Sequence, residues 1–331
     1  MNTASTSSGP PAIPLNQQNH TTVEIVPPPM PPPFPVPWNL PRSDLLDGPR
    51  EDYIKIGVLL YEAAIKGDWK TAKPILDKHT DVIRFAITEN YDTLLHIAAS
   101  AESTKAVEEF VTKLVQLMEI GDLELQNKNY NTALSLAAAA GNVKAAMIMV
   151  KKNPAVQDIP GNNRTMPLYM AAMFEKPIMV RYLHGISKQM EGDCWSHDNR
   201  GSVLLKCVEA DIFDVAIKIV YDRPDLIDKK ELLRDILVTL AQKTDAFEGT
   251  KPNVVLRIIN SFFVRFHVKI GPLEKESEAL QFLRIIWERV ARMPKQDIAD
   301  IIRGPPERVQ NKNKDKESEV MLLARTNLGK N

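Results

Sequence analysis

One short pattern recurs along this chain and limits its fold more than any other feature: a leucine, two variable residues and a pair of small residues. The copies are Leu60-Tyr61-Glu62-Ala63-Ala64, Leu95-His96-Ile97-Ala98-Ala99, Leu134-Ser135-Leu136-Ala137-Ala138, Leu168-Tyr169-Met170-Ala171-Ala172 and Leu204-Leu205-Lys206-Cys207-Val208. Their first small residues lie 35, 39, 34 and 36 positions apart. A recurrence near this period is typical of stacked helical repeats, which favours binding over catalysis.

Each repeat is expected to hold two antiparallel helices, with the small pair where two backbones approach closely. The second helices are predicted over residues 71–78, 103–118, 143–152, 177–187 and 213–222. Val82, Val156 and Leu226 each lie 19 positions after the first small residue of their repeat, so we expect them to fill the space between neighbouring repeats. Leu240 lies 33 residues after Cys207 and indicates a sixth, degenerate unit.

Polar clusters separate the repeats and carry the candidate binding residues. Asn, Asp and Gly tolerate the backbone of tight turns, so the segments 89–92, 128–131, 161–164 and 198–201 are expected to form projecting hairpin tips. Aromatic and arginine side chains at such tips are typical interface anchors, and the alternative is that they are ordinary turn residues. The predicted partner-binding residues are Asn90, Tyr91, Asn129, Tyr130, Asn162, Asn163, Arg164, Asn199 and Arg200.

These features resemble the ankyrin repeat. Its signature Thr-Pro-Leu-His-x-Ala-Ala is matched best by residues 93–99, with partial matches at 132–134 and 166–168. His appears in one copy only, and Cys207-Val208 replaces the alanine pair in the last copy. The resemblance implies that His96 braces the turn through hydrogen bonds. It also implies an all-α fold, an ankyrin-repeat α-solenoid followed by a helical extension.

Residues 237–247 and the helical segments 277–288 and 295–302 are similar to plant ankyrin proteins that end in a transmembrane PGG domain. Leu280, Leu283, Trp287 and Val290 also form an apolar helical face on physical grounds. The membrane domain and the second ankyrin block of that family are missing. Arg325 and its neighbour stand where small residues belong, which indicates a truncated chain.

The predicted organisation has four zones. Residues 1–50 form a disordered tail with 13 of the 24 prolines, residues 51–250 hold about six repeats, residues 251–303 are a helical cap, and residues 304–331 are a charged linker with an incomplete repeat. Proline fixes φ and lacks an N–H donor, so the tract at 27–37 is expected to be extended. It is either a passive tail or a ligand for an SH3 or WW domain.

Composition and motifs disfavour several classes of function. The 42 basic and 42 acidic residues give no net field that would attract nucleic acid. Two cysteines favour a reducing compartment, and no apolar run is long enough to span a membrane. Motifs for phosphate loops and nucleophile elbows are absent. The set His184, Cys194, His197 and Cys207 has zinc-like spacing, but Cys207 is expected to face the helical stack.

The sequence therefore predicts a non-enzymatic adaptor without cofactors. It would bind a partner protein through a concave face of hairpin tips and first helices, in plant stress or defence signalling. The alternative is the cytosolic portion of a membrane-anchored signalling or channel-like protein. The predicted location is the cytoplasm, at the cytoplasmic side of the plasma membrane in the full-length family context.

Overall fold

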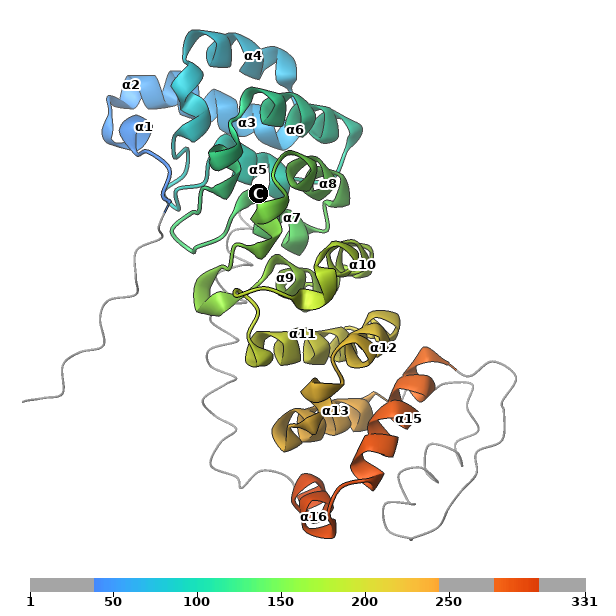
Figure 1. Ribbon diagram of the computed structural model, residues 1–331. Helices are drawn as coiled ribbons and strands as arrows, with labels where there is room; N and C mark the ends of the chain where they lie inside the picture. The colour runs from blue at the N-terminus through green and yellow to red at the C-terminus, as the bar shows by residue number, and fades with distance from the viewer. Residues whose placement is uncertain (1–38, 244–276, 304–331) are drawn as a thin grey trace, which may run out of the picture. The chain divides into compact units, whose positions relative to one another are not determined.

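The computed structural model describes residues 39–243 and 277–303 of the chain (Figure 1). In these ranges the secondary structure is helical, apart from isolated β-bridges between Arg42 and Phe85 and between Gln126 and Thr132. The proline tract at 27–37, residues 251–276 of the predicted cap and the predicted linker at 304–331 lie outside the described residues. The hypotheses about those segments, including an SH3 or WW ligand, stay predictions.

Helical pairs follow one another along the described chain, as the recurring pattern predicted. The first helices are α3 (Leu59–Lys66), α5 (Leu94–Ser100), α7 (Ala133–Ala140), α9 (Pro167–Met173) and α11 (His197–Glu209). The second helices are α4 (Trp69–Lys78), α6 (Lys105–Leu117), α8 (Val143–Lys152), α10 (Pro177–Ile186) and α12 (Phe213–Asp222). Each first helix packs on the first helix of the next pair (Figure 1). The predicted second helices are confirmed, with ends that differ by at most two residues.

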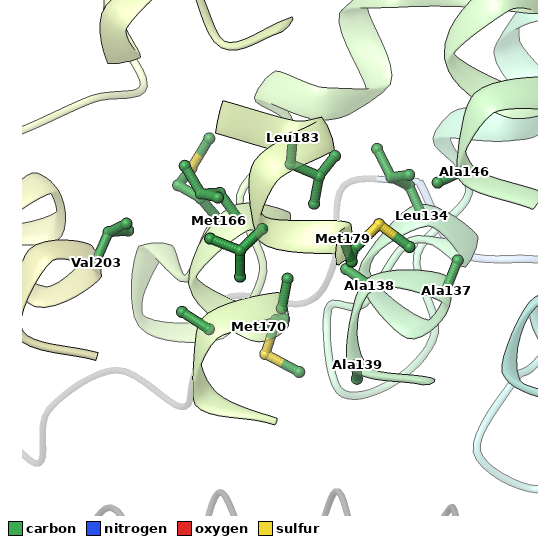
Figure 2. Close-up of a cluster of buried hydrophobic side chains, with 14 of the residues drawn as sticks. Leu134, Ala137, Ala138, Ala139, Ala146, Met166, Met170, Met179, Leu183 and Val203 are labelled. Carbon is green, nitrogen blue, oxygen red and sulfur yellow. The ribbon is translucent and has the colours of Figure 1, made fainter. Parts of the chain in front are cut away.

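The small pair lies where the first helices meet. Ala98, Ala137, Ala171 and Cys207 have no exposed surface, and Ala63 has 2%. In Figure 2 the pair Ala137 and Ala138 lies in the cluster that also contains side chains from α9 and α10. The small side chain of alanine lets two helices pack closely. Because alanine also has a high helix propensity, the pair favours the helix and sets its distance from the next one.

The turns that end the first helices also permit close approach between repeats. Gly67 follows α3 with a left-handed φ of 69°, which glycine adopts without steric cost. A Cβ atom at this position would lie 2.4 Å from the carbonyl carbon of Ala106 in α6. Any larger residue at position 67 would therefore push the first two repeats apart.

Short 3₁₀ helices close each repeat and bury the residues predicted to fill the gaps. Val82 lies in η2 (Thr80–Arg84), Val156 in η4 (Pro154–Asp158) and Leu226 in η7 (Pro224–Asp228). All three are buried, at 2%, 0% and 0% exposure, which confirms the register inferred from their spacing. In the second repeat Leu123 takes this place in η3 (Ile120–Glu124), because α6 is longer.

The folded region begins before residue 51, so the predicted tail boundary at residue 50 is corrected. The short helices α1 (Asp44–Asp47) and α2 (Arg50–Asp52) lead into a π-helix, η1 (Tyr53–Val58), and Leu45 is buried. The Arg42 N–H donates to Arg84 O (3.0 Å), and the Ala86 N–H donates to Arg42 O (2.7 Å). The Gln126 N–H donates to Asn39 O (2.8 Å). These bonds fasten residues 39–42 to the segments that join the first repeat to the second and the second repeat to the third.

The last described helices continue the stack at the place where a degenerate sixth unit is predicted. Helix α13 (Lys230–Gln242) packs on α11 with Leu240 buried, as a first helix would. Helix α15 (Glu278–Ala291) packs on α12, on the side of the second helices, and α16 (Lys295–Arg303) packs on α13. Within the predicted apolar face of α15, Leu280, Leu283 and Val290 are buried and Trp287 is half-buried. Residues 278–291 and 295–303 are therefore helical, and their role as a cap stays a prediction.

Candidate functional site: the interrepeat turns

Three turns between successive repeats hold most of the predicted binding residues. We call residues 88–92 turn A, residues 127–131 turn B and residues 161–165 turn C. The Tyr91 N–H donates to Thr88 O (2.8 Å) in turn A, and the Tyr130 N–H donates to Asn127 O (2.9 Å) in turn B. The Gly161 N–H donates to Thr165 O (2.7 Å) in turn C. The predicted hairpin turns are confirmed at these three places.

The same backbone strain recurs at equivalent positions of the three turns. Tyr91, Tyr130 and Arg164 have φ values of 64°, 63° and 59°, and each lies seven residues before the first small residue of its repeat. A non-glycine residue in this left-handed region costs about 1 kcal/mol. Large side chains thus occupy positions where glycine would be more stable, a pattern typical of functional sites.

Turns A and B are joined by a ladder of side-chain hydrogen bonds. Asn129 Nδ2 donates to Asn90 Oδ1 (2.9 Å), and Asn127 Nδ2 donates to Asp92 Oδ1 (2.7 Å). The Asn127 side chain is buried, and its Oδ1 accepts from the backbone N–H groups of Asn129 and Asn131 at 3.0 Å each. Two of the predicted binding residues, Asn90 and Asn129, are half-buried and bond to each other.

His96 braces turn B from α5, as the resemblance implied. Its Nδ1 accepts from the backbone N–H of Thr93 (3.3 Å), so the proton lies on Nε2, which donates to Asn131 O (3.0 Å). The ring is 1% exposed, and burial lowers the pKa of His96. The neutral imidazole therefore acts as a structural link between neighbouring repeats.

Gln126 joins turn B to turn C. Its Nε2 donates to Tyr130 O (2.9 Å) and to Pro160 O (3.0 Å), and the residue is 6% exposed. Asn131 Oδ1 lies near Gly161, at 3.5 Å from where a Cβ atom would be. The two turns are consequently held together by buried contacts, which fixes the relative positions of Tyr130 and turn C.

The two tyrosines differ in what covers their rings. Lys128 Nζ lies 4.3 Å from the centroid of the Tyr91 ring, in a cation–π contact. The residue equivalent to Lys128 in the next repeat is Asn162, which has no charge to offer Tyr130. The Tyr130 side chain is half-buried and makes no hydrogen bond or cation–π contact with the described part of the chain.

Turn C exposes its polar residues. Asn163 and Arg164 are exposed and Asn162 is half-exposed, and none of the three side chains makes a hydrogen bond or ion pair with residues of the two described ranges. The turn is braced instead by Thr165, whose hydroxyl donates to Asn162 O (2.8 Å).

The prediction of a fourth hairpin tip at 198–201 is wrong, because these residues lie in the first turns of α11. Ser196 caps this helix by accepting from the Asn199 N–H (3.2 Å). Asn199 Nδ2 donates to Cys194 O (2.9 Å), and Arg200 Nε donates to Met190 O (2.9 Å). Both side chains are thus used to hold the preceding loop.

The structure does not gather the four residues with zinc-like spacing. No cluster of three metal-ligating side chains exists within the described residues. Cys207 is buried in α11, and burial raises the pKa of its thiol to about 12. Cys194 is half-buried, and burial raises its thiol pKa as well. Neither thiol therefore has the low pKa of an activated nucleophile.

The predicted binding residues do not include those that organise the turns. Gln126, Asn127 and Asp92 were not among the predicted site residues, although their hydrogen bonds fix the tips. When the repeats are aligned, Thr88 and Asn127 occupy the same repeat position, and both are polar residues that begin a turn. This recurrence could have identified them from the sequence. Such residues commonly bond to the backbone of a turn.

The fold and the turns define a class of protein, the helical-repeat binding modules. Residues 95–192 match a family model for ankyrin repeats in three copies, which spans turns B and C and the helices around them. The chain therefore contains ankyrin repeats, and its described part forms an all-α ankyrin solenoid. A comparison with curated proteins gave no significant match. Ankyrin repeats support a protein–protein interaction role in general.

One structural finding bears on the predicted membrane context. Among the helices of residues 39–243 and 277–303, none combines the length and the apolar character needed to cross a membrane.

Proposed function

We propose that this chain is a non-enzymatic adaptor that binds a partner protein through turns B and C and the first helices beside them. The proposal rests on which of the nine predicted binding residues already make side-chain contacts within the protein. Asn90, Tyr91, Asn129, Asn199 and Arg200 make internal contacts. The remaining four are Tyr130, Asn162, Asn163 and Arg164, which we call the tip patch.

The tip patch has the composition of an interface anchor. Tyrosine and arginine are enriched among the residues that dominate binding energy at protein interfaces. The patch is also held in place before binding, because His96 and Gln126 fix turn B and link it to turn C. Such pre-organisation reduces the entropy lost on association.

The experiment is affinity capture with the full chain, followed by measurement of Kd for the partner that it identifies. Tyr130→Ala and Arg164→Ala should each weaken binding about tenfold, the loss typical of interface anchors. Tyr91→Ala should weaken binding much less, because the Tyr91 ring already contacts Lys128.

Tyr221→Ala provides a matched control. Tyr221 lies on the second helix α12 and is 65% exposed, so its removal changes a surface tyrosine outside the turns. Circular dichroism should show unchanged helical content for all four variants. Equal binding by Tyr130→Ala, Arg164→Ala and Tyr221→Ala would contradict the proposed site.

The resemblance to plant ankyrin proteins with a PGG domain adds a finer proposal. In it the adaptor acts in stress or defence signalling, in the cytoplasm or as the cytosolic portion of a longer membrane-anchored protein. Sequencing the transcript beyond Asn331 tests the second form, which requires further repeats and apolar segments. A fluorescent fusion of the full-length product tests the location. An organellar or secreted product would contradict both forms.

A further inference from the structure

We propose that the tip patch recognises an acidic segment of its partner protein, with a carboxylate bound by Arg164 next to the ring of Tyr130. This inference rests on the proposed function and adds the chemistry of the partner. It rests on the charges of turns B and C and on side chains there that are not used in hydrogen bonds or ion pairs within the described part of the chain.

The charges within turns B and C are both positive, although Glu124 and Asp158 lie just outside them and Asp92 of turn A bonds to Asn127. Residues 125–131 and 159–166 contain Lys128 and Arg164 but no aspartate or glutamate. Both cations are exposed, and neither forms an ion pair with the described part of the chain. A partner with basic residues at this place would meet repulsion, whereas acidic residues would meet attraction.

Arg164 differs from other arginines of the repeats in this respect. Arg181 Nε lies 2.7 Å from Asp214 Oδ2, and Arg84 Nε lies 2.6 Å from Asp122 Oδ1. Arg200, which has the same repeat position as Arg164, donates to a backbone carbonyl. The guanidinium of Arg164 therefore keeps its donors available. Its planar fork suits a carboxylate, which it binds through two parallel hydrogen bonds.

The neighbouring residues supply the rest of a binding surface. Tyr130 offers a ring without a cation above it, which suits an apolar or proline side chain beside the acidic group. The amides of Asn162 and Asn163 offer further donors. Nucleic acid fits less well, because it requires an extended basic surface, and the chain has equal numbers of basic and acidic residues.

The test is a selection of random peptides on the immobilised full chain. Each enriched peptide is then measured by fluorescence anisotropy against the wild-type chain, Tyr130→Ala, Arg164→Ala and the control Tyr221→Ala. We expect enriched peptides to contain aspartate or glutamate and to lose about tenfold in affinity with Arg164→Ala. Arg164→Glu should lose more, and replacing the acidic residues by their amides should have the same effect as Arg164→Ala.

The outcomes separate this inference from the proposed function. Peptides that depend on Tyr130 but are neutral or basic would overturn the acidic partner and leave the tip patch as a binding site. Peptides insensitive to both Tyr130→Ala and Arg164→Ala would overturn the site itself. A mixed-sequence single-stranded oligonucleotide serves as a competitor. If it binds as tightly as the peptides and with the same dependence on Arg164, the acidic protein segment is wrong and nucleic acid takes its place.

Discussion

Turns A and B have the same backbone but different surroundings. Tyr91 and Tyr130 adopt nearly equal φ values, 64° and 63°, and both are half-buried. The Tyr91 ring lies under Lys128, which comes from the next repeat along the chain. For Tyr130, the equivalent residue of the next repeat is Asn162, which has no charge. The role of a turn residue in a repeat protein is therefore set by its neighbour along the stack. Two residues with one local structure therefore differ in what they can bind.

The largest expected effect comes from the brace under turn B. His96→Ala should lower the free energy of unfolding by about 3 kcal/mol, because it opens a buried cavity and leaves the Asn131 carbonyl and the Thr93 N–H unpaired. Chemical denaturation checks this value. Turn A has no such histidine, since the equivalent residue of the first repeat is Tyr61. A loss below about 1 kcal/mol would show that the ladder alone holds turn B.

A pH dependence should follow from the same histidine. Burial lowers the pKa of His96 in the folded state, so the unfolded chain binds a proton more readily. The contribution of neutral His96 is fully present above the unfolded pKa of about 6.5 and is lost as pH falls towards the folded pKa. Between pH 7 and 5 we expect the free energy of unfolding to fall.

His96→Gln separates this effect from the other groups that titrate. Burial also lowers the pKa of His184, which adds to the loss of stability in acid. The variant should therefore show a smaller fall between pH 7 and 5 than the wild-type chain. An identical fall in both proteins would assign the pH dependence to other groups.

The strain in turn B gives a third prediction. Tyr130→Gly should be more stable than Tyr130→Ala by about 1 kcal/mol, because glycine adopts a left-handed φ freely. Thermal unfolding of both variants checks this difference. The matched pair Tyr221→Gly and Tyr221→Ala should show the opposite order, since position 221 lies inside helix α12. Both Tyr130 variants should bind the partner equally weakly, which would separate strain from recognition.

The smallest effect concerns the contact that distinguishes the two tyrosines. Lys128→Met should lower the free energy of unfolding by about 0.5 kcal/mol, the value of an exposed cation–π contact. Lys105→Met is the control, because Lys105 is exposed at the start of α6 and makes no ion pair within the described chain. If the two lysine variants are equally stable, Lys128 does not hold the Tyr91 ring, and the difference between turns A and B is smaller than the structure indicates.

The sequence predicted the repeats and their register well, and the site only in part. Small pairs and buried residues at fixed spacing reflect packing that every repeat shares, so Val82 and Val156 could be placed without coordinates. The segment 198–201 was misassigned because its Asn, Arg and Gly residues are typical of turns. Ser196 caps a helix there. Gly201 packs so close to Leu232 that a Cβ atom added at position 201 would lie 3.2 Å from the Leu232 side chain. Tertiary packing outweighed the local preference.

The sequence by itself determined that this chain forms a stack of helical pairs and that polar turns join them, because both properties depend on residues close together in the chain. Only the tertiary structure decided which turn residues remain available. Asn129 bonds to Asn90 across 39 residues, and Lys128 covers Tyr91 across the same boundary between repeats. Contacts of this kind depend on the stacking distance and on side-chain direction, which no local pattern encodes. They leave the side chains of Tyr130 and Arg164 without a hydrogen bond or ion pair among the described residues, and the proposed tip patch rests on that difference.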